Sequence, residues 1–306
     1  MTLKIFDLVT YYYSELGTEE VTLYVGEARK KFTVHKKLLC KIDFFLGAFC
    51  RGFKEGVENT MDLPEDHPEA FELFIDWVYK AKLPAWEDME KLLVSYAQVV
   101  AYHEHLQKFY IFAEKTCIPI LPNKIMDLLL LVNMTLRAMD KTLPDTYLRA
   151  LAAAYDKTTE GSPLRKLFVH SLVWSLWDLG IRNVEEDLVE EDSVEGDSVG
   201  AGEAKAVQQG WVERVWEATS DRVDLFEDIV TEFKAYSPEN CPKFPRDSRW
   251  VNEASPCYFH SHDTEGEEAR CEGSWETEIA RKLKQAIDWQ VELIRVVAQD
   301  RTWFMR

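Results

Sequence analysis

The feature that most constrains the fold is a change of hydrophobic periodicity near the start of the chain. In the run VTLYVG, Val21, Leu23 and Val25 alternate with Thr22 and Tyr24, and the run KFTVH at 31–35 alternates in the same way. Alternation with a period of two is typical of half-buried strands, and the turn-like GEARK between the runs predicts a hairpin. From residue 36 onward the apolar residues recur at helical spacing. The sequence therefore predicts a strand hairpin that leads directly into helices.

The rest of the chain is expected to be mostly helical. A short strand at about 61–63 precedes a turn and a helix, for which Asp66 is a candidate N-cap and Pro68 lies in the first turn. Amphipathic or apolar patterns predict further helices at about 86–102, 106–117, 123–139, 144–158 and 163–180, and then at 210–236 and 274–299.

A strongly acidic segment divides these helices. Residues 183–206 contain nine acidic side chains before the first basic one, no aromatic residue and only scattered Val and Leu. Such a composition buries too little apolar surface to offset the entropy of ordering, so we expect a disordered linker. The alternative is an acidic tether that recruits a basic partner.

Composition excludes several classes of partner and location. The 306-residue chain has a net charge of −18, and a polyanion gains nothing from counterion release, so nucleic acid is not expected as a partner. The start has no signal-peptide pattern, and the most apolar segment of the chain, IMDLLLLVNM at 125–134, is too short to span a bilayer. The six cysteines are scattered, which favours free thiols in a reducing compartment, the cytoplasm or the nucleus.

The motifs VTLYVG, FTVHKKLL, FKE and LPEDHPEAF follow one another at fixed spacing across residues 21–84. In this order they resemble the BTB/POZ domain, and they look most like its fungal versions. The resemblance implies an α+β fold: a short three-stranded sheet packed with helices, followed by a mostly α-helical C-terminal region. The expected organisation is an N-terminal extension (1–16), the BTB/POZ domain (17–120), a helical extension (121–182), the acidic linker (183–206) and a helical region (207–306) with an irregular segment at 237–273.

The same resemblance implies a non-catalytic module that binds other proteins. Cullin-binding BTB domains carry a hydrophobic-x-Glu motif before the third strand, which Phe53, Lys54 and Glu55 match, so a substrate adaptor of a cullin-RING ubiquitin ligase is one expectation. In dimerising members an acidic residue opens the first strand and a basic residue follows the junction histidine. Glu20 and Lys36 hold those positions. A self-associating structural or regulatory protein without a ligase role is the alternative.

Two groups of cysteine and histidine have the side chains needed for catalysis or for metal binding. His35 and Cys40 lack the third residue that orients a catalytic base, and we expect His35 to fix the strand-to-helix junction through a bond to nearby backbone. No other catalytic motif is present, so we do not expect an enzyme or an organic cofactor.

The second group lies in the irregular segment. Cys257, His260, His262 and Cys271 have the donor types of a structural zinc site, with Cys241 as a substitute ligand, although their spacing is not that of a standard zinc finger. Unligated thiols and imidazoles packed together are the other interpretation.

Overall fold

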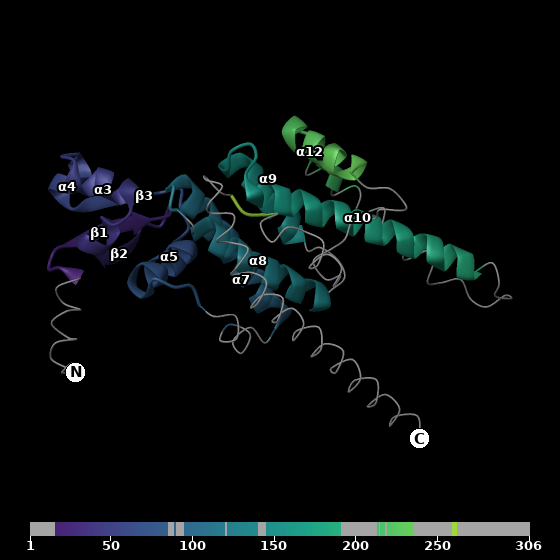
Figure 1. Ribbon diagram of the computed structural model, residues 1–306, viewed down its shortest axis with the longest axis horizontal. Coiled ribbons are helices and arrows are strands. Elements are labelled where there is room, and N and C mark those ends of the chain that lie inside the picture. The colour runs from purple at the N-terminus through teal and green to yellow at the C-terminus, as the bar shows by residue number, and fades with distance from the viewer. Residues whose placement is uncertain are drawn as a thin grey trace, which may run out of the picture. The chain divides into compact units, whose positions relative to one another are not determined.

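The computed structural model describes residues 16–84, 89, 95–119, 121–139, 145–190, 213, 215–217, 219–235 and 259–261. The chain divides into two compact units, Met1–Leu129 and Leu130–Arg306, and the division falls within helix α8 (Leu121–Met139) (Figure 1). Most of the first half of the helix expected at 86–102, the helix expected at 274–299, most of the N-terminal extension and residues 191–206 of the acidic segment lie outside the described residues.

The first unit is built on a three-stranded sheet. Strands β1 (Glu20–Val25) and β2 (Lys30–His35) pair antiparallel, and β3 (Thr60–Leu63) pairs parallel to β1 on its other side. Val21, Leu23 and Val25 are all buried, which confirms the period-two pattern. The hairpin and the third strand are thus as the sequence predicts.

Among the described residues, this unit also contains the helices α2 (Lys36–Leu39), α3 (Asp43–Cys50), α4 (Lys54–Glu58), α5 (Pro68–Lys80) and α7 (Tyr96–Lys115), and the first part of α8. Its core is aromatic. The Phe74 ring lies 5.7 Å from that of Phe45 on α3, 5.2 Å from that of Phe71 on α5 and 5.0 Å from that of Phe112 on α7. All four rings are buried, so they join three helices through edge-to-face and stacked contacts.

Two helix starts differ from expectation. Helix α5 has His67 at its N-cap position, and the Asp66 carboxylate instead forms an ion pair with the Lys115 ammonium at 2.9 Å. Helix α7 is continuous where two helices, 86–102 and 106–117, were expected. It begins after Ser95, whose side chain forms a capping box with Gln98. With no Gly or Pro inside α7, nothing interrupts its backbone hydrogen bonds.

In the second unit, α9 (Asp145–Lys157) and α10 (Pro163–Glu190) confirm two predicted helices. Helix α10 runs on past residue 182, into the segment expected to be a disordered linker; the Glu and Leu residues there favour helix. The single helix expected at 210–236 is instead interrupted by a turn at Ser220 and Asp221, after which α12 (Val223–Lys234) begins. Ser and Asp compete with helical backbone bonds, which explains this break.

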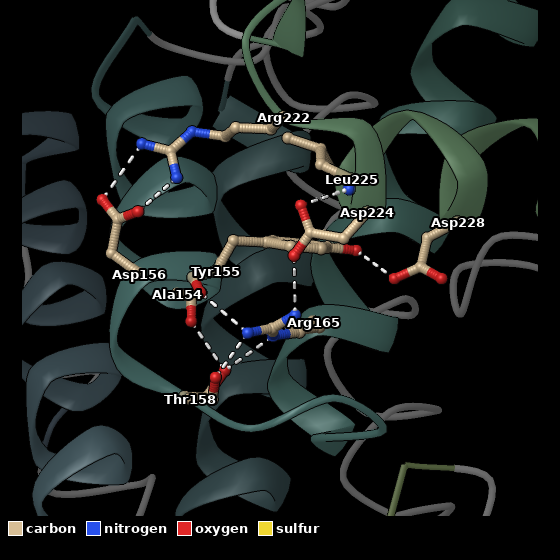
Figure 2. A network of polar contacts seen from close by, with 9 residues as sticks. All are labelled: Ala154, Tyr155, Asp156, Thr158, Arg165, Arg222, Asp224, Leu225 and Asp228. Atoms are coloured by element: carbon tan, nitrogen blue, oxygen red, sulfur yellow. Dashed lines mark hydrogen bonds and ion pairs between the residues drawn. The ribbon is translucent and has the colours of Figure 1, made fainter.

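A polar network attaches α12 to α9 and α10 (Figure 2). The buried Arg165 guanidinium donates to the carbonyl oxygens of Tyr155 and Thr158, which caps the C-terminal end of α9, and it pairs with Asp224 at 3.1 Å. The Tyr155 hydroxyl donates to the Asp228 carboxylate at 2.5 Å. Burial is the largest cause of the raised pKa of Tyr155, and the hydrogen bond to Asp228 is the second. One arginine therefore links three helices of this unit.

A membrane-spanning helix is not found in the described part of the chain, since none of its helices combines the required length with sufficient hydropathy.

Candidate protein-interaction surface

The expected partner motif lies on a short exposed helix. Phe53 is the N-cap residue of α4 and is 58% exposed, and Val57, one turn later, is 79% exposed. Lys54 forms an i,i+4 ion pair with Glu58, and Glu55 is half-buried in the first turn. Large apolar side chains exposed side by side in this way offer contact area to another protein. We call Phe53–Val57 the α4 patch.

The α4 patch is held firmly by the backbone around it. Gly52 precedes it with φ of +80°, and Asn59 ends α4 in the left-handed region with φ of 51°. Between them, Gly56 packs directly on α3: a Cβ atom there would lie 2.6 Å from the Phe49 carbonyl oxygen. The Asn59 carbonyl also accepts a bond from the Thr22 amide in β1 at 2.9 Å. The exposed side chains are therefore presented from a fixed support.

Two glycines give a matched test of this support. We expect Gly56→Ala to lower the free energy of unfolding by about 2 kcal/mol or more, because the added methyl group meets a carbonyl that cannot move without shifting α3. Gly47→Ala, within α3, has open space around it and is expected to raise stability by about 0.5–1 kcal/mol. Denaturant unfolding of the two variants measures both values, and equal effects would contradict the close packing of α4 on α3.

The second expected surface, Glu20 and Lys36, has a different arrangement. The Lys36 side chain is 18% exposed, and its ammonium lies 3.4 Å from the Glu19 carboxylate and 3.1 Å from the Asn59 amide oxygen. Glu20 is exposed and is paired in register with His35. Lys36 therefore joins the start of β1 to the end of α4, and the carboxylate beside it is that of Glu19, which the sequence reasoning missed. A dimer role for Glu20 and Lys36 stays a prediction.

His35 does lie at the junction, but its partner is not the nearby backbone. Its Nδ1 lies 2.7 Å from the hydroxyl of Tyr79 on α5, and the same hydroxyl accepts from the His35 amide at 3.3 Å. The ring thus ties the end of β2 to the end of α5.

Cys40 has a different partner, Cys50. Burial and the bond to Cys50 raise the pKa of the Cys40 thiol to about 12, opposite to the lowered pKa of an activated nucleophile.

The zinc hypothesis falls largely outside the described residues. Of its ligands only His260 is described, next to Phe259, whose ring lies 5.7 Å from that of His170. Cys257, His262, Cys271 and the substitute Cys241 are not described. Across the described ranges, no cluster of three or more His, Cys, Asp or Glu is placed to bind a metal ion. The zinc site stays a prediction.

The three-stranded sheet, the helical pair that follows the junction histidine and the exposed α4 together define a BTB/POZ domain. Residues 14–109 match the BTB/POZ domain family, so the chain contains this protein-interaction module.

Its similarity to curated proteins is confined to the same part of the chain. Over 102 residues the chain is 28% identical to Kelch-like protein 25 of Xenopus tropicalis, and 26% identical to Kelch-like protein 25 of Homo sapiens and of Mus musculus. These residues are 33% of this chain and 17% of each relative, so the chain spans about a sixth of the length of those proteins. No solved structure gives a significant match.

Proposed function

We propose that this protein is a non-catalytic adaptor whose BTB/POZ domain binds a cullin through the α4 patch and thereby brings another protein to a ubiquitin ligase. The observation that carries the proposal is the exposure of Phe53 at the start of α4. The motif Phe53-Lys54-Glu55 matches the hydrophobic-x-Glu pattern of cullin-binding BTB domains.

The support beneath the α4 patch favours this function. A binding site whose backbone is already fixed loses little conformational entropy when the partner docks, which increases affinity. Gly56, packed on the Phe49 carbonyl, and Asn59, bonded to β1, fix α4 in this way. An exposed aromatic ring is also the kind of side chain that supplies most of the binding energy at protein interfaces. As part of the same proposal, the domain is of the fungal BTB type and the protein is located in the cytoplasm or the nucleus.

Co-purification from the source cell tests the proposal. We expect tagged full-length chain to recover a cullin, identified by mass spectrometry, and the double change Phe53→Ala with Glu55→Ala to abolish the recovery. Lys80→Ala is the matched control, because Lys80 lies on α5, outside the α4 patch, and its exposed ion pair with Asp76 contributes little. It should leave recovery unchanged.

The alternative, self-association without a ligase role, predicts a different result. A second copy would pair through the surface of Glu20 and Lys36, so light scattering would give a dimer that dissociates when the exposed Glu20 is changed to lysine, and no cullin would be recovered with the wild-type chain. Recovery of cullin in equal amounts by the wild-type and double-variant proteins would contradict the assignment of the site.

A further inference from the structure

Two thiols lie close together at the ends of α2 and α3. Cys40 is the C-cap residue of α2 and Cys50 is the last residue of α3, and their sulfur atoms are 3.1 Å apart. Both are free thiols in the structure. A disulfide bond has an S–S distance of about 2.05 Å, so the two sulfurs need to approach by only about 1 Å to form one.

The two thiols differ in access. Cys50 is exposed and can meet a dissolved oxidant, whereas Cys40 is half-buried. Burial is the largest cause of the raised pKa of Cys40, followed by its bond to Cys50 and by charge on Cys50 and Glu19, while Lys36 acts in the opposite direction. Because the thiolate is the reactive form, Cys50 is the thiol that reacts first and Cys40 the one that resolves the intermediate.

We propose that Cys40 and Cys50 form a reversible dithiol–disulfide site that a small disulfide such as glutathione disulfide can close. The Cys50 thiolate attacks one sulfur of glutathione disulfide, forms a mixed disulfide and releases one glutathione. The Cys40 thiolate then attacks the Cys50 sulfur, breaks the bond to glutathione and releases the second one. Two protein thiols are oxidised, one glutathione disulfide is reduced to two thiols, and the two cysteine protons end on the released glutathiones.

The bond would join the end of α2 to the end of α3, two residues before Gly52–Phe53. In the reducing compartment expected from the sequence, the pair stays reduced until the glutathione pool becomes more oxidised. Formation of this disulfide does not depend on the proposed cullin contact, because the experiment detects the bond between Cys40 and Cys50 directly. Its failure and the failure of the proposed function are therefore separate results.

Peptide mapping tests the inference on the full chain. Trypsin cleaves after Lys37, Lys41 and Arg51, so Cys40 and Cys50 fall on separate peptides, 38–41 and 42–51. After treatment with glutathione disulfide and blocking of free thiols, we expect these two peptides joined as the major product. Dithiothreitol should separate them. Cys117→Ser, which removes another exposed thiol, should leave the product unchanged, and Cys40→Ser should stop the reaction at Cys50 joined to glutathione.

The rate of closure supplies a second readout. Burial, the largest cause, keeps the pKa of Cys40 above its ordinary value also in the mixed disulfide, so the conversion of the mixed disulfide into the joined peptides should become faster as the pH rises from about 7 to 9. Three results would overturn the inference: both cysteines carrying glutathione separately, Cys50 joined to a different cysteine, or both thiols unreacted under conditions that modify Cys117.

Discussion

Phe74→Ala is expected to lower the free energy of unfolding by about 3–5 kcal/mol, which is the usual cost of removing a buried phenylalanine ring. Phe74 is fully buried, and its ring contacts those of Phe45, Phe71 and Phe112. Removal of the ring would therefore leave a cavity between α3, α5 and α7. Chemical denaturation of the full chain, followed by circular dichroism, measures the loss in the transition of the first unit.

Phe53→Ala is the control for this change, because it removes the same ring from the surface. Phe53 is exposed at the start of α4, so we expect its loss to alter stability by less than about 0.5 kcal/mol. If the two variants unfold at the same denaturant concentration, the aromatic cluster is not the core of the first unit.

Arg165→Ala is expected to destabilise the second unit by about 3–5 kcal/mol. The change leaves the carbonyl oxygens of Tyr155 and Thr158 without their donor, at about 1–3 kcal/mol each, and removes the guanidinium that lies 4.4 Å from the centre of the Tyr155 ring. The ion pair itself adds little, because the Asp224 side chain is 57% exposed. Hydrogen exchange of the amides in α9 and α12 measures the loss within the full chain.

Two further variants distinguish the loss of the α9 cap from the loss of a positive charge. Arg149→Ala removes an exposed arginine from α9 and is expected to leave exchange unchanged. Arg165→Lys keeps the charge but lacks the planar group that reaches both carbonyls, so its exchange should lie between that of the wild type and that of Arg165→Ala. Wild-type exchange in Arg165→Lys would show that charge alone, and not the cap, stabilises this unit.

Local pattern predicted much of the fold. Alternation placed β1 and β2, because neighbouring residues decide that pattern. Expectations failed where a partner distant in the sequence decides the outcome. Asp66 was a reasonable helix cap by sequence, but Lys115 lies beside it in the fold. Arg165 and Asp224 are likewise 59 positions apart in the sequence, and no local sequence pattern predicts that they form an ion pair.

The position of the candidate site is a prediction from the sequence, whereas its support is seen only in the structure. Resemblance to BTB domains located Phe53, Lys54 and Glu55, whereas Glu19, Tyr79 and the packing of Gly56 on α3 emerged only from the folded chain. A signal for part of this did exist. Gly56 lies inside a short polar helix and Asn59 follows it, and both residues favour special backbone geometry or close approach.

Phe53 on α4 is the proposed contact through which this protein binds a cullin. Titration calorimetry of the full chain with a purified cullin N-terminal region measures that contact directly. We expect a dissociation constant on the order of 1 µM or below, and a weakening of about 30-fold or more in Phe53→Ala, as for a residue that dominates an interface. Lys80→Ala, outside the α4 patch, should bind as the wild type does. No heat of binding at concentrations of about 100 µM, or the same affinity in Phe53→Ala, would contradict the claim.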